Sequence, residues 1–371
     1  MKEGWEYKKL GEVCELYQPK TISTKEMVAD GKYNVFGANG IIGKYNQYNH
    51  EHSEILMTCR GATCGNINIS TPKSWINGNA MVIHIKNELL LHRAFLVHAL
   101  SFIDKKNIIT GAAQPQITRQ TLSPLVIAFP TLSEQQSIVD YLDSAFAKID
   151  AMKANAEKAL NEAKALFQAS LKEMLEPKEG WEEKKLEDIT EVKDGTHDSP
   201  KYVTEGIPFV TQKNITINGF DLLNTKKISL EDHKKFYTRS NVEFGDIIIA
   251  MIGANRGMSC IVDTQEIFSI KNVGLIKKND NINMRYLLFY LHSHSANTYI
   301  LDNSNGGAQE FIGLKGLRTF PIPYPPLSVQ QSIVATLDSL KSKVDRLQEN
   351  YDKISQECDA LKQAILRQVF E

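Results

Sequence analysis

Two long stretches of the chain carry apolar residues at helical spacing and contain neither proline nor glycine. The first covers residues 133–176, and the second runs from about residue 328 to residue 371. Apolar residues recur in both at intervals of three and four, which is typical of a helix that packs along one narrow seam. At about 1.5 Å per residue, the first stretch would form a helix about 66 Å long.

The register of these intervals predicts which side chains form the seam of each helix. The predicted seam residues are Leu142, Ile149, Met152 and Leu166 in the first helix, and Leu337, Leu340, Val344, Leu347, Tyr351, Ile354, Leu361 and Ile365 in the second. The first seam is otherwise rich in Ala and Ser, whereas the second carries larger side chains at the matching places. Small residues that face large ones fill the space between two helices.

We therefore expect the two helices to pack on each other as an antiparallel coiled-coil pair. Such a pair would put two globular domains at its opposite ends, related by a pseudo-two-fold axis. The alternative is two separate amphipathic helices, each lying on its own domain.

The chain also repeats itself. Residues 3–16 match residues 179–192 at eight of fourteen positions, and residues 130–150 match residues 325–345 at thirteen of twenty-one. The offset is 176 for the first pair of blocks and 195 for the second, so the second copy has 19 extra residues between them. The interiors have diverged much further than these ends. We infer a shared framework whose interiors can have different roles.

The repeat divides the chain into four segments. Globular domains are expected at 1–130 and 177–326, and helical segments at 131–176 and 327–371. Apolar, β-branched runs at 80–85 and 246–251 predict strands, and residues 91–103 and 284–301 predict short helices. The expected fold class is α+β, with two mixed α/β domains joined by the two helices. Because the sequence that follows the first helix repeats the sequence at the start of the chain, we predict that the two ends of the chain lie close together.

Composition and charge limit the classes of protein to which this chain can belong. The 371 residues are 42% hydrophobic and 23% charged, which is ordinary for a soluble globular protein. The net charge is -1, so bulk charge does not indicate a nucleic-acid binder, although residues 1–130 hold 14 Lys and Arg against 10 Asp and Glu. No apolar run approaches the roughly 20 residues of a membrane span, and the first residues are too polar for a signal peptide. The five cysteines include no CxxC pair, so we expect no metal site and a cytoplasmic location.

The chain lacks the sequence signatures of a catalyst. It has no Walker A loop, no GxSxG elbow, no HExxH and no adenine-methyltransferase motif. An enzyme that acts alone is therefore disfavoured, and no residue is expected to be catalytic.

Glycine-rich polar loops are the most distinctive feature of both interiors. Asn and Gln can bond adenine, Arg and Lys can bond guanine, and glycine lets the backbone approach a phosphate. The candidate DNA-binding residues are Asn39, Lys44, Tyr45, Arg60, Gln114, Gln116 and Arg119 in the first domain, and His197, Lys201, Gln212, Lys213, Asn214, Arg239, Asn255, Arg256 and Gln309 in the second. Ordinary surface turns are also rich in Gly and Asn, and His197 could instead hold its loop together by hydrogen bonds.

The chain, with its repeated sequence blocks, resembles the specificity subunit of type I restriction–modification systems. The resemblance rests on PTLSEQQSIV at 130–139 and PPLSVQQSIV at 325–334, and on the two Gly-Trp openings. The segments DGTH at 194–197, GIPFV at 206–210 and GDII at 245–248 support it. It implies two target recognition domains that each read one half of a bipartite, asymmetric DNA site. The helices would be spacers that set the gap and dock two modification subunits.

The same resemblance implies partners and cofactors. The partners would be double-stranded DNA, two adenine methyltransferase subunits and motor-nuclease restriction subunits, with no membrane. S-adenosylmethionine, ATP and Mg²⁺ would belong to the partner subunits, and this chain would hold no cofactor. Two alternatives remain at this point: a coiled-coil scaffold or adaptor whose loops bind proteins, and a recognition subunit of a different DNA modification or defence system.

Overall fold

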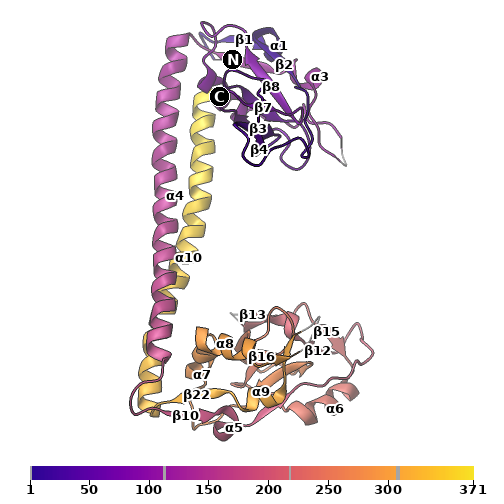
Figure 1. The fold of residues 1–371 in the computed structure, drawn as a ribbon, viewed down its shortest axis with the longest axis vertical. Helices are drawn as coiled ribbons and strands as arrows, with labels where there is room; N and C mark the ends of the chain where they lie inside the picture. The colour runs from indigo at the N-terminus through magenta and orange to yellow at the C-terminus, as the bar shows by residue number, and fades with distance from the viewer. Residues whose placement is uncertain (1, 112–113, 217–218, 306–309) are drawn as a thin grey trace. The chain divides into compact units, whose positions relative to one another are not determined.

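The computed structural model describes residues 2–111, 114–216, 219–305 and 310–371. The chain forms two compact units, of which unit 1 comprises Met1–Ala156 with Tyr351–Glu371, and unit 2 comprises Glu157–Asn350. The division cuts both long helices, α4 (Leu132–Leu175) and α10 (Leu327–Phe370). Each unit therefore holds a globular part together with one segment of each helix (Figure 1).

The globular part of unit 1 is built on an antiparallel sheet in the order β2-β8-β5-β6. Its strands are β2 (Cys14–Tyr17), β8 (Ala80–Ile85), β5 (Ile55–Thr58) and β6 (Ile67–Ile69). A second sheet, β4-β3-β7, joins β4 (Gly40–Tyr45) and β3 (Tyr33–Gly37) as a hairpin and adds β7 (Trp75–Ile76) parallel to β3. β1 (Glu6–Lys9) pairs with β9 (Val126–Phe129), and the short helices are α1 (Leu10–Val13), α2 (Arg93–Phe102) and α3 (Arg119–Leu122).

Both faces of the four-stranded sheet in unit 1 are covered. Met81 and Ile83 pack in one hydrophobic cluster with Phe95 of α2, whereas Ala80 and Val82 pack in another with Phe36 and Ile76 of the second sheet. Successive residues of a strand point to opposite faces, so a strand buried on both sides must be apolar at every position. This is why residues 80–83 form a continuous apolar run, whereas His84, towards the end of the strand, is exposed; β8 confirms the strand predicted at 80–85.

Unit 2 repeats the same sheets. The four-stranded antiparallel sheet is β11-β19-β16-β17, the mixed sheet is β15-β12-β18, and β10 pairs with β22. These strands are β10 (Glu182–Lys185), β11 (Val192–Asp194), β12 (Ile207–Val210), β15 (Lys226–Ile228), β16 (Ile247–Ala250), β17 (Ser259–Ile261), β18 (Ser269–Ile270), β19 (Val273–Ile276) and β22 (Pro321–Tyr324). The parallel pair β12–β18 corresponds to β3–β7 of unit 1, and β16 confirms the strand predicted near 246–251.

Most of the extra residues of the second copy lie between β12 and β16. The two-residue turn between β3 and β4 is replaced by residues 211–225, which include η1 (Gln212–Asn214), β13 (Ile215–Thr216) and β14 (Gly219–Phe220). Helix α6 (Leu230–Ser240) is inserted between β15 and β16. The remaining elements are α5 (Leu186–Ile189), α7 (Met284–Leu291), α8 (His294–Asp302), β20 (Ser304–Asn305), β21 (Phe311–Ile312) and α9 (Leu314–Arg318).

The helix predicted at 91–103 is α2, but the single helix predicted at 284–301 is wrong. It is divided into α7 and α8, because Ser293 starts a new helix there. The Ser293 hydroxyl accepts a hydrogen bond from the Ala296 N–H at 3.2 Å and so caps α8.

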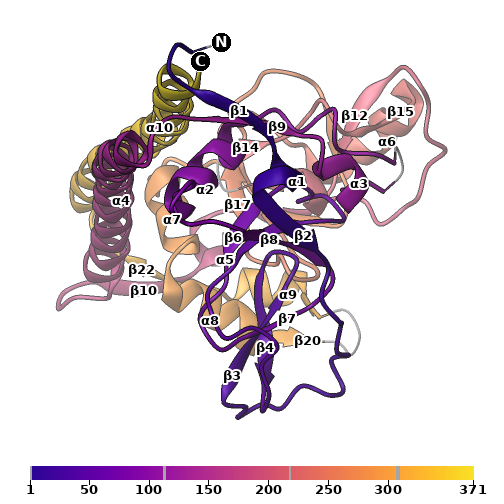
Figure 2. The same ribbon diagram turned by 90° about the horizontal axis from the view of Figure 1, so that it is seen from above.

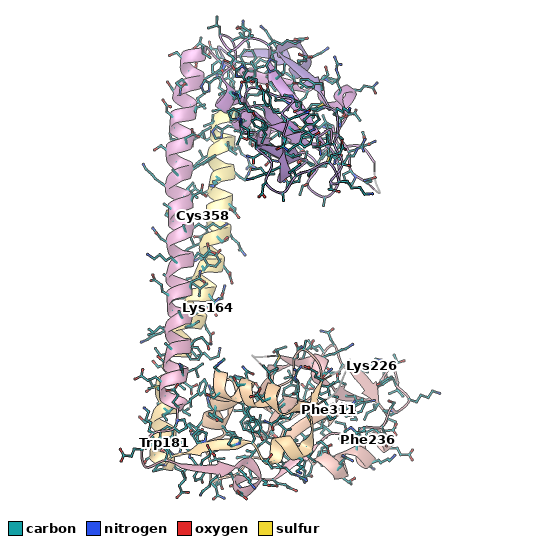
Figure 3. The ribbon with its side chains drawn as sticks, viewed as in Figure 1. Lys164, Trp181, Lys226, Phe236, Phe311 and Cys358 are labelled. Atoms are coloured by element: carbon teal, nitrogen blue, oxygen red, sulfur yellow. The ribbon has the colours of Figure 1, made fainter. Side chains whose placement is uncertain are left out.

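The two long helices pack against each other in antiparallel directions within each unit. In unit 1, Lys153 of α4 forms an ion pair with Asp359 of α10 at 3.5 Å. About one turn earlier in α4, Asp150 forms an ion pair at 2.5 Å with Lys362, which lies about one turn later in α10. In unit 2, Lys164 Nζ donates to Gln348 Oε1 at 2.8 Å. Figure 3 labels one residue of the long helices in each unit, Cys358 of α10 in unit 1 and Lys164 of α4 in unit 2. The predicted helix pairing is thus confirmed within the units.

The predicted seam residues differ in exposure. Leu142, Ile149 and Leu337 are buried, and Leu340, Val344, Leu347, Tyr351, Ile354 and Ile365 are half-buried. Met152, Leu166 and Leu361 instead have exposed fractions of 58%, 59% and 48%.

Lys153 and Lys362 directly follow Met152 and Leu361 in the sequence, are less exposed, and contact the other long helix. Phe167 follows Leu166 and is also less exposed, but its ring packs toward Phe289 of α7, with centroids 6.5 Å apart. A lysine can bury its apolar stem while its ammonium reaches an acid on the other helix. Lys153 and Lys362 each reach an aspartate on the other helix in this way. The contact between the helices therefore includes lysines, which a pattern of apolar residues does not identify.

The two ends of the chain meet in unit 1, as the repeat predicted. The Lys2 ammonium donates to the Val369 carbonyl oxygen, and the Phe370 ring packs against Phe102 with centroids 5.7 Å apart. Figure 2 shows the two termini side by side. In unit 2, Trp181 packs with Leu171 and Leu175 at the end of α4 (Figure 3). Each tryptophan block thus receives the end of the long helix from the other copy.

No helix in the part of the chain that the structure describes is long and apolar enough to cross a membrane.

Candidate functional site

A Gly-Ala-x-x-Gly turn follows the central strand β5 in unit 1 and β16 in unit 2. Both glycines of each turn have left-handed backbone angles, with φ of +86° and +93° at Gly61 and Gly65, and of +74° and +90° at Gly253 and Gly257. Side chains rarely tolerate this conformation, which explains the glycines. The second glycine donates its N–H to the last carbonyl of the strand, at 2.9 Å in unit 1 and 2.8 Å in unit 2.

The structure shows that these two turns are equivalent, which the sequence comparison had not found. The offset between them is 192 residues, which matches neither end of the repeat. The sheet register identifies them as counterparts, because each follows the central strand of the equivalent four-stranded sheet.

A second loop packs beside this turn in both units. In unit 1, Gly61 N–H donates to Pro115 O at 3.1 Å, and Ile117 N–H donates to Cys59 O at 2.9 Å. In unit 2, Gly253 N–H donates to Glu310 O at 3.0 Å, and Ile312 N–H donates to Met251 O at 2.9 Å. Two loops that are about 50 residues apart in the sequence thus present one joint surface, which we call the loop surface of each unit.

The loop surface of unit 1 gathers most of the predicted residues of that domain. Arg60 and Gln116 pair as a β-bridge, and both side chains are exposed, as is that of Gln114. Asn39 adjoins them, because its Oδ1 lies 3.4 Å from Asn66 Nδ2 beyond the glycine turn. Arg119 is also exposed and begins α3, two residues after Ile117.

Lys44 and Tyr45 lie apart from this surface. They form the far end of β4, about 13 Å from the turn at Asn39 if each strand residue spans about 3.3 Å. The Tyr45 ring packs edge-on against Trp75 with centroids 5.4 Å apart, so it belongs to the second sheet. Lys44 and Tyr45 therefore lie outside the loop surface of unit 1, and their candidacy for DNA binding stays a prediction.

His197 and Arg239 are joined through one buried carboxylate. Asp194 accepts hydrogen bonds from Arg239 Nε at 3.0 Å and Nη2 at 2.7 Å, and its other oxygen lies 3.0 Å from His197 Nε2. The second ring nitrogen of His197 lies 2.8 Å from Asn272 Oδ1. A buried carboxylate requires such partners, so these contacts support the alternative in which His197 holds its loop together.

Asn214 and Arg256 are engaged within unit 2, and the expectation of direct DNA contact is corrected for both. Asn214 is buried, and its Oδ1 accepts hydrogen bonds from the Thr211 N–H at 2.9 Å and hydroxyl at 3.0 Å. The Arg256 side chain is 12% exposed, donates to Gly253 O at 3.0 Å and forms an ion pair with Glu310. Since their polar atoms are already paired, both residues shape the loops.

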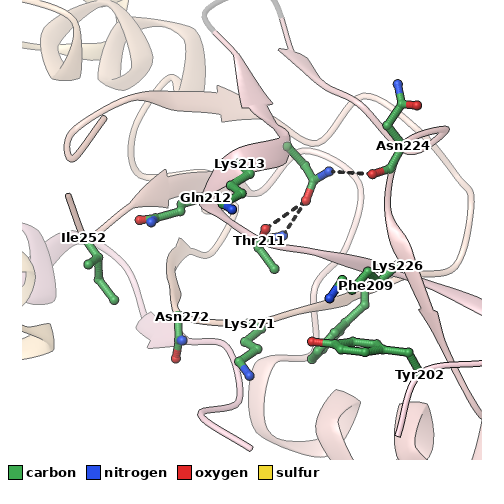
Figure 4. A pocket seen from close by; sticks show the side chains of 11 residues that line it. Tyr202, Phe209, Thr211, Gln212, Lys213, Asn224, Lys226, Ile252, Lys271 and Asn272 are labelled. Carbon is green, nitrogen blue, oxygen red and sulfur yellow. Dashed lines mark hydrogen bonds between the residues drawn. The ribbon is translucent and has the colours of Figure 1, made fainter. Parts of the chain in front are cut away.

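The remaining candidates of unit 2 are exposed or line a pocket. Lys201 and Asn255 are exposed. Gln212 and Lys213 line a pocket of about 380 Å³ together with residues that sequence analysis did not select, above all Tyr202, Lys226 and Lys271 (Figure 4). These come from distant parts of the chain, and only the pairing of β12 with β15 and β18 brings them together. Gln309 lies outside the described residues.

The two cysteines at the loop surface of unit 1 are not activated thiols. Burial raises the pKa of the Cys59 thiol to about 11, and burial also raises the pKa of Cys64. Thiols with raised pKa values stay protonated near neutral pH and are poor nucleophiles. Burial lowers the pKa of Lys105, whose stem packs against Gly65. Among the described residues, no group of three or more His, Cys, Asp or Glu side chains could hold a metal ion.

Comparison with known protein families identifies the family of this chain independently of the site geometry. The family model described as the type I restriction modification DNA specificity domain matches residues 2–162 and 178–356. The matched ranges contain both loop surfaces and most of both long helices.

Individual relatives agree with this match. The chain is 23% identical over 324 residues to the type I restriction enzyme EcoBI specificity subunit of Escherichia coli, an alignment that covers 75% of this chain. It covers 65% of that relative, so the chain spans less than two thirds of its length.

Solved structures show the same fold. One chain, from a study of complex assembly and conformational transition of the type I R-M system, matches with a TM-score of 0.76 at 20% identity, covering 100% of this chain and 98% of that one. The HsdS subunit from Thermoanaerobacter tengcongensis matches with a TM-score of 0.60 at 20% identity, covering 100% and 97%.

Proposed function

Since this chain belongs to the family of type I restriction modification DNA specificity domains, we propose that it is the non-catalytic DNA-recognition subunit of such a system. Each unit would read one half of a bipartite, asymmetric site through its loop surface. The observation that carries this proposal is that both units build the same pair of adjoining loops on the same sheet and fill them with different side chains.

The chemistry of the loop surfaces supports recognition of bases. Arg60 and Gln116 side by side offer the donors and acceptors that bind guanine and adenine edges in the major groove. Arg119 would contact the phosphate backbone, because contacts to phosphates position a protein without reading sequence. Different residues in unit 2, with Lys201 and Asn255 exposed, would read a different half-site.

The long helices would set the gap between the half-sites. Each has 44 residues, or about 66 Å at about 1.5 Å per residue, which is enough to separate half-sites that lie about 34 Å apart on one face of the duplex. An internal two-fold repeat would suit the symmetry of a duplex backbone.

The same helices would dock two adenine-modification subunits. Met152, Leu166 and Tyr141 are exposed apolar residues of α4, and Leu361 is one of α10. Such residues on a charged helix are suited to a protein partner. S-adenosylmethionine would act on the modification subunits, and ATP with Mg²⁺ on motor-nuclease subunits, so this chain would contribute recognition alone.

Methylation mapping tests this function directly. We would co-express the chain with the adenine methyltransferase encoded beside its gene and sequence the host DNA for methyladenine. One bipartite motif, methylated on both strands, is expected, and the methyltransferase expressed alone is the control. A purified complex that adds no methylation would instead favour a scaffold whose loops bind proteins. A scaffold would also show no salt-dependent affinity for DNA.

A further inference from the structure

The pocket of unit 2 has a chemistry that reading base edges in a groove does not require. Its charged lining residues are Lys213, Lys226 and Lys271, and no carboxylate occurs among the described residues that line it. Three ammonium groups in a concave site of about 380 Å³ create a local positive potential that attracts an anion.

Two of these lysines have only neutral partners in the structure. Lys271 Nζ donates to Ser199 Oγ at 2.7 Å, and Lys226 Nζ lies 4.3 Å from the centroid of the Tyr202 ring. Neither contact cancels the positive charge. Lysine binds phosphate as a point charge, so the pair is suited to a phosphate group.

The aromatic ring of Tyr202 lines the pocket next to Lys226. Tyr202 is 41% exposed, and its ring is backed by the buried Phe209 with centroids 6.4 Å apart. Figure 4 shows Tyr202, Lys226 and Lys271 gathered at one side of the pocket. An accessible aromatic ring beside phosphate-binding cations is the arrangement on which a nucleobase stacks.

The opposite wall contributes an unpaired amide. Gln212 Oε1 is buried and has no hydrogen-bond partner within the described part of the chain, which is unfavourable for an acceptor in a protein. A ligand that donates a hydrogen bond would relieve this cost after a small rotation of the side chain. Bases with exocyclic amino groups carry such donors.

The pocket is specific to unit 2. Gln212, Lys213 and Asn224 belong to residues 211–225, which replace the two-residue turn between β3 and β4 of unit 1. The shared framework therefore does not require this side of the pocket. Tyr202, Lys226 and Lys271 instead lie on or beside the mixed sheet β15-β12-β18, whose counterpart in unit 1 is β4-β3-β7.

We propose that this pocket binds one nucleotide, with its phosphate on Lys226 and Lys271 and its base stacked on Tyr202. The nucleotide is either free or part of a DNA strand, drawn out of the base stack. The shared chemistry is a phosphate next to a planar base. The DNA form rests on the proposed function, whereas the free form does not.

Equilibrium binding to the full-length chain tests the proposal, with adenosine and thymidine 5′-monophosphate and inorganic phosphate as probes. The monophosphates are expected to bind at least fivefold more tightly than inorganic phosphate. The Lys226→Gln variant should weaken nucleotide binding at least fivefold, and Tyr202→Leu should remove the advantage over inorganic phosphate. Lys185→Gln, an equal change of charge on an exposed residue of β10, is the matched control and should leave the affinity unchanged.

A second measurement distinguishes the two sources, using the target duplex found by methylation mapping. If the duplex displaces the monophosphate, the pocket takes a nucleotide of DNA. If both bind together, it takes a free nucleotide. Absence of monophosphate binding, affinity equal to that for inorganic phosphate, or affinity unchanged in both pocket variants would overturn the proposal. Failure of the DNA-recognition function would differ, because no duplex would bind while the nucleotide still did.

Discussion

Phe370, the last residue of α10, packs edge-on against Trp5, with ring centroids 6.3 Å apart and ring planes at 87°. This contact joins the end of the second repeat to the start of the first. The corresponding end of α4 packs on Trp181 in unit 2. In each unit, the end of one long helix therefore packs on the tryptophan block of the other copy.

A circular permutant tests this arrangement. If the chain is opened between Glu176 and Pro177 and Glu371 is joined to Met1, the same contacts can form, so we expect a soluble protein with nearly the parental melting temperature. Thermal unfolding followed by circular dichroism checks this. A permutant opened inside β8 is the control and should not fold, because it interrupts a buried strand. An insoluble first permutant would contradict this arrangement.

Truncation of Phe370 should destabilise unit 1. The ring also packs against Phe95 with centroids 5.5 Å apart, but Phe370 is only half-buried. We expect Phe370→Ala to lower the free energy of unfolding by about 2 kcal/mol, below the roughly 3–5 kcal/mol of a fully buried phenylalanine. Denaturant titration measures the change. Leu361→Ala, on the exposed side of the same helix, should cost far less.

Lengthening both long helices should change the gap in the DNA site. The two helices pack along a common seam, so seven residues must be inserted into each at facing positions to keep their contacts, one insertion after Ala156 and one after Ser355. About 10.5 Å would be added, or about 3 base pairs at roughly 3.4 Å per pair. Methylation mapping should show a longer gap between unchanged half-sites. Altered half-site bases with an unaltered gap would contradict the spacer role.

Two arginines of equivalent regions should respond differently to substitution. Arg60 is exposed, so Arg60→Ala should weaken binding of the target duplex about tenfold without a change in melting temperature. Arg256 is mostly buried and bonded to Gly253, so Arg256→Ala should lower the free energy of unfolding by about 1–3 kcal/mol. Binding titrations and melting curves of both variants separate these effects. Equal effects of the two substitutions on stability would contradict the assignment.

The stability of unit 2 should fall in mild acid. Burial lowers the pKa of His292, whose Nε2 lies 2.8 Å from Ser259 O, and burial also lowers that of His233. Their ordinary value is 6.5, so below that pH the unfolded chain binds more protons than the folded one and stability decreases. Denaturant midpoints at pH 7.5 and 5.5 measure this loss. His292→Gln should reduce it, whereas substitution of the exposed His52 should not.

Periodicity was a reliable guide where one physical constraint dominates. The long helices, the apolar strands β8 and β16 and the meeting of the chain ends all follow from apolar spacing or from repeated text. The failures have specific causes. The apolar pattern selects Leu361 rather than Lys362, because it does not show that a lysine stem can be buried. It also predicts one helix across Ser293, because it does not show that a capping hydroxyl starts a new helix there.

The sequence by itself determined the duplication, the helical framework and the family of this protein, because repeated blocks and seam residues are written in order along the chain. Tertiary structure decided which polar residues are available for contact. Arg60 and Arg256 look alike in the sequence, yet one is exposed and the other is bonded to Gly253 and Glu310. Only strand register brings Tyr202, Lys226 and Lys271 together, because the availability of a side chain depends on neighbours that are distant in the chain.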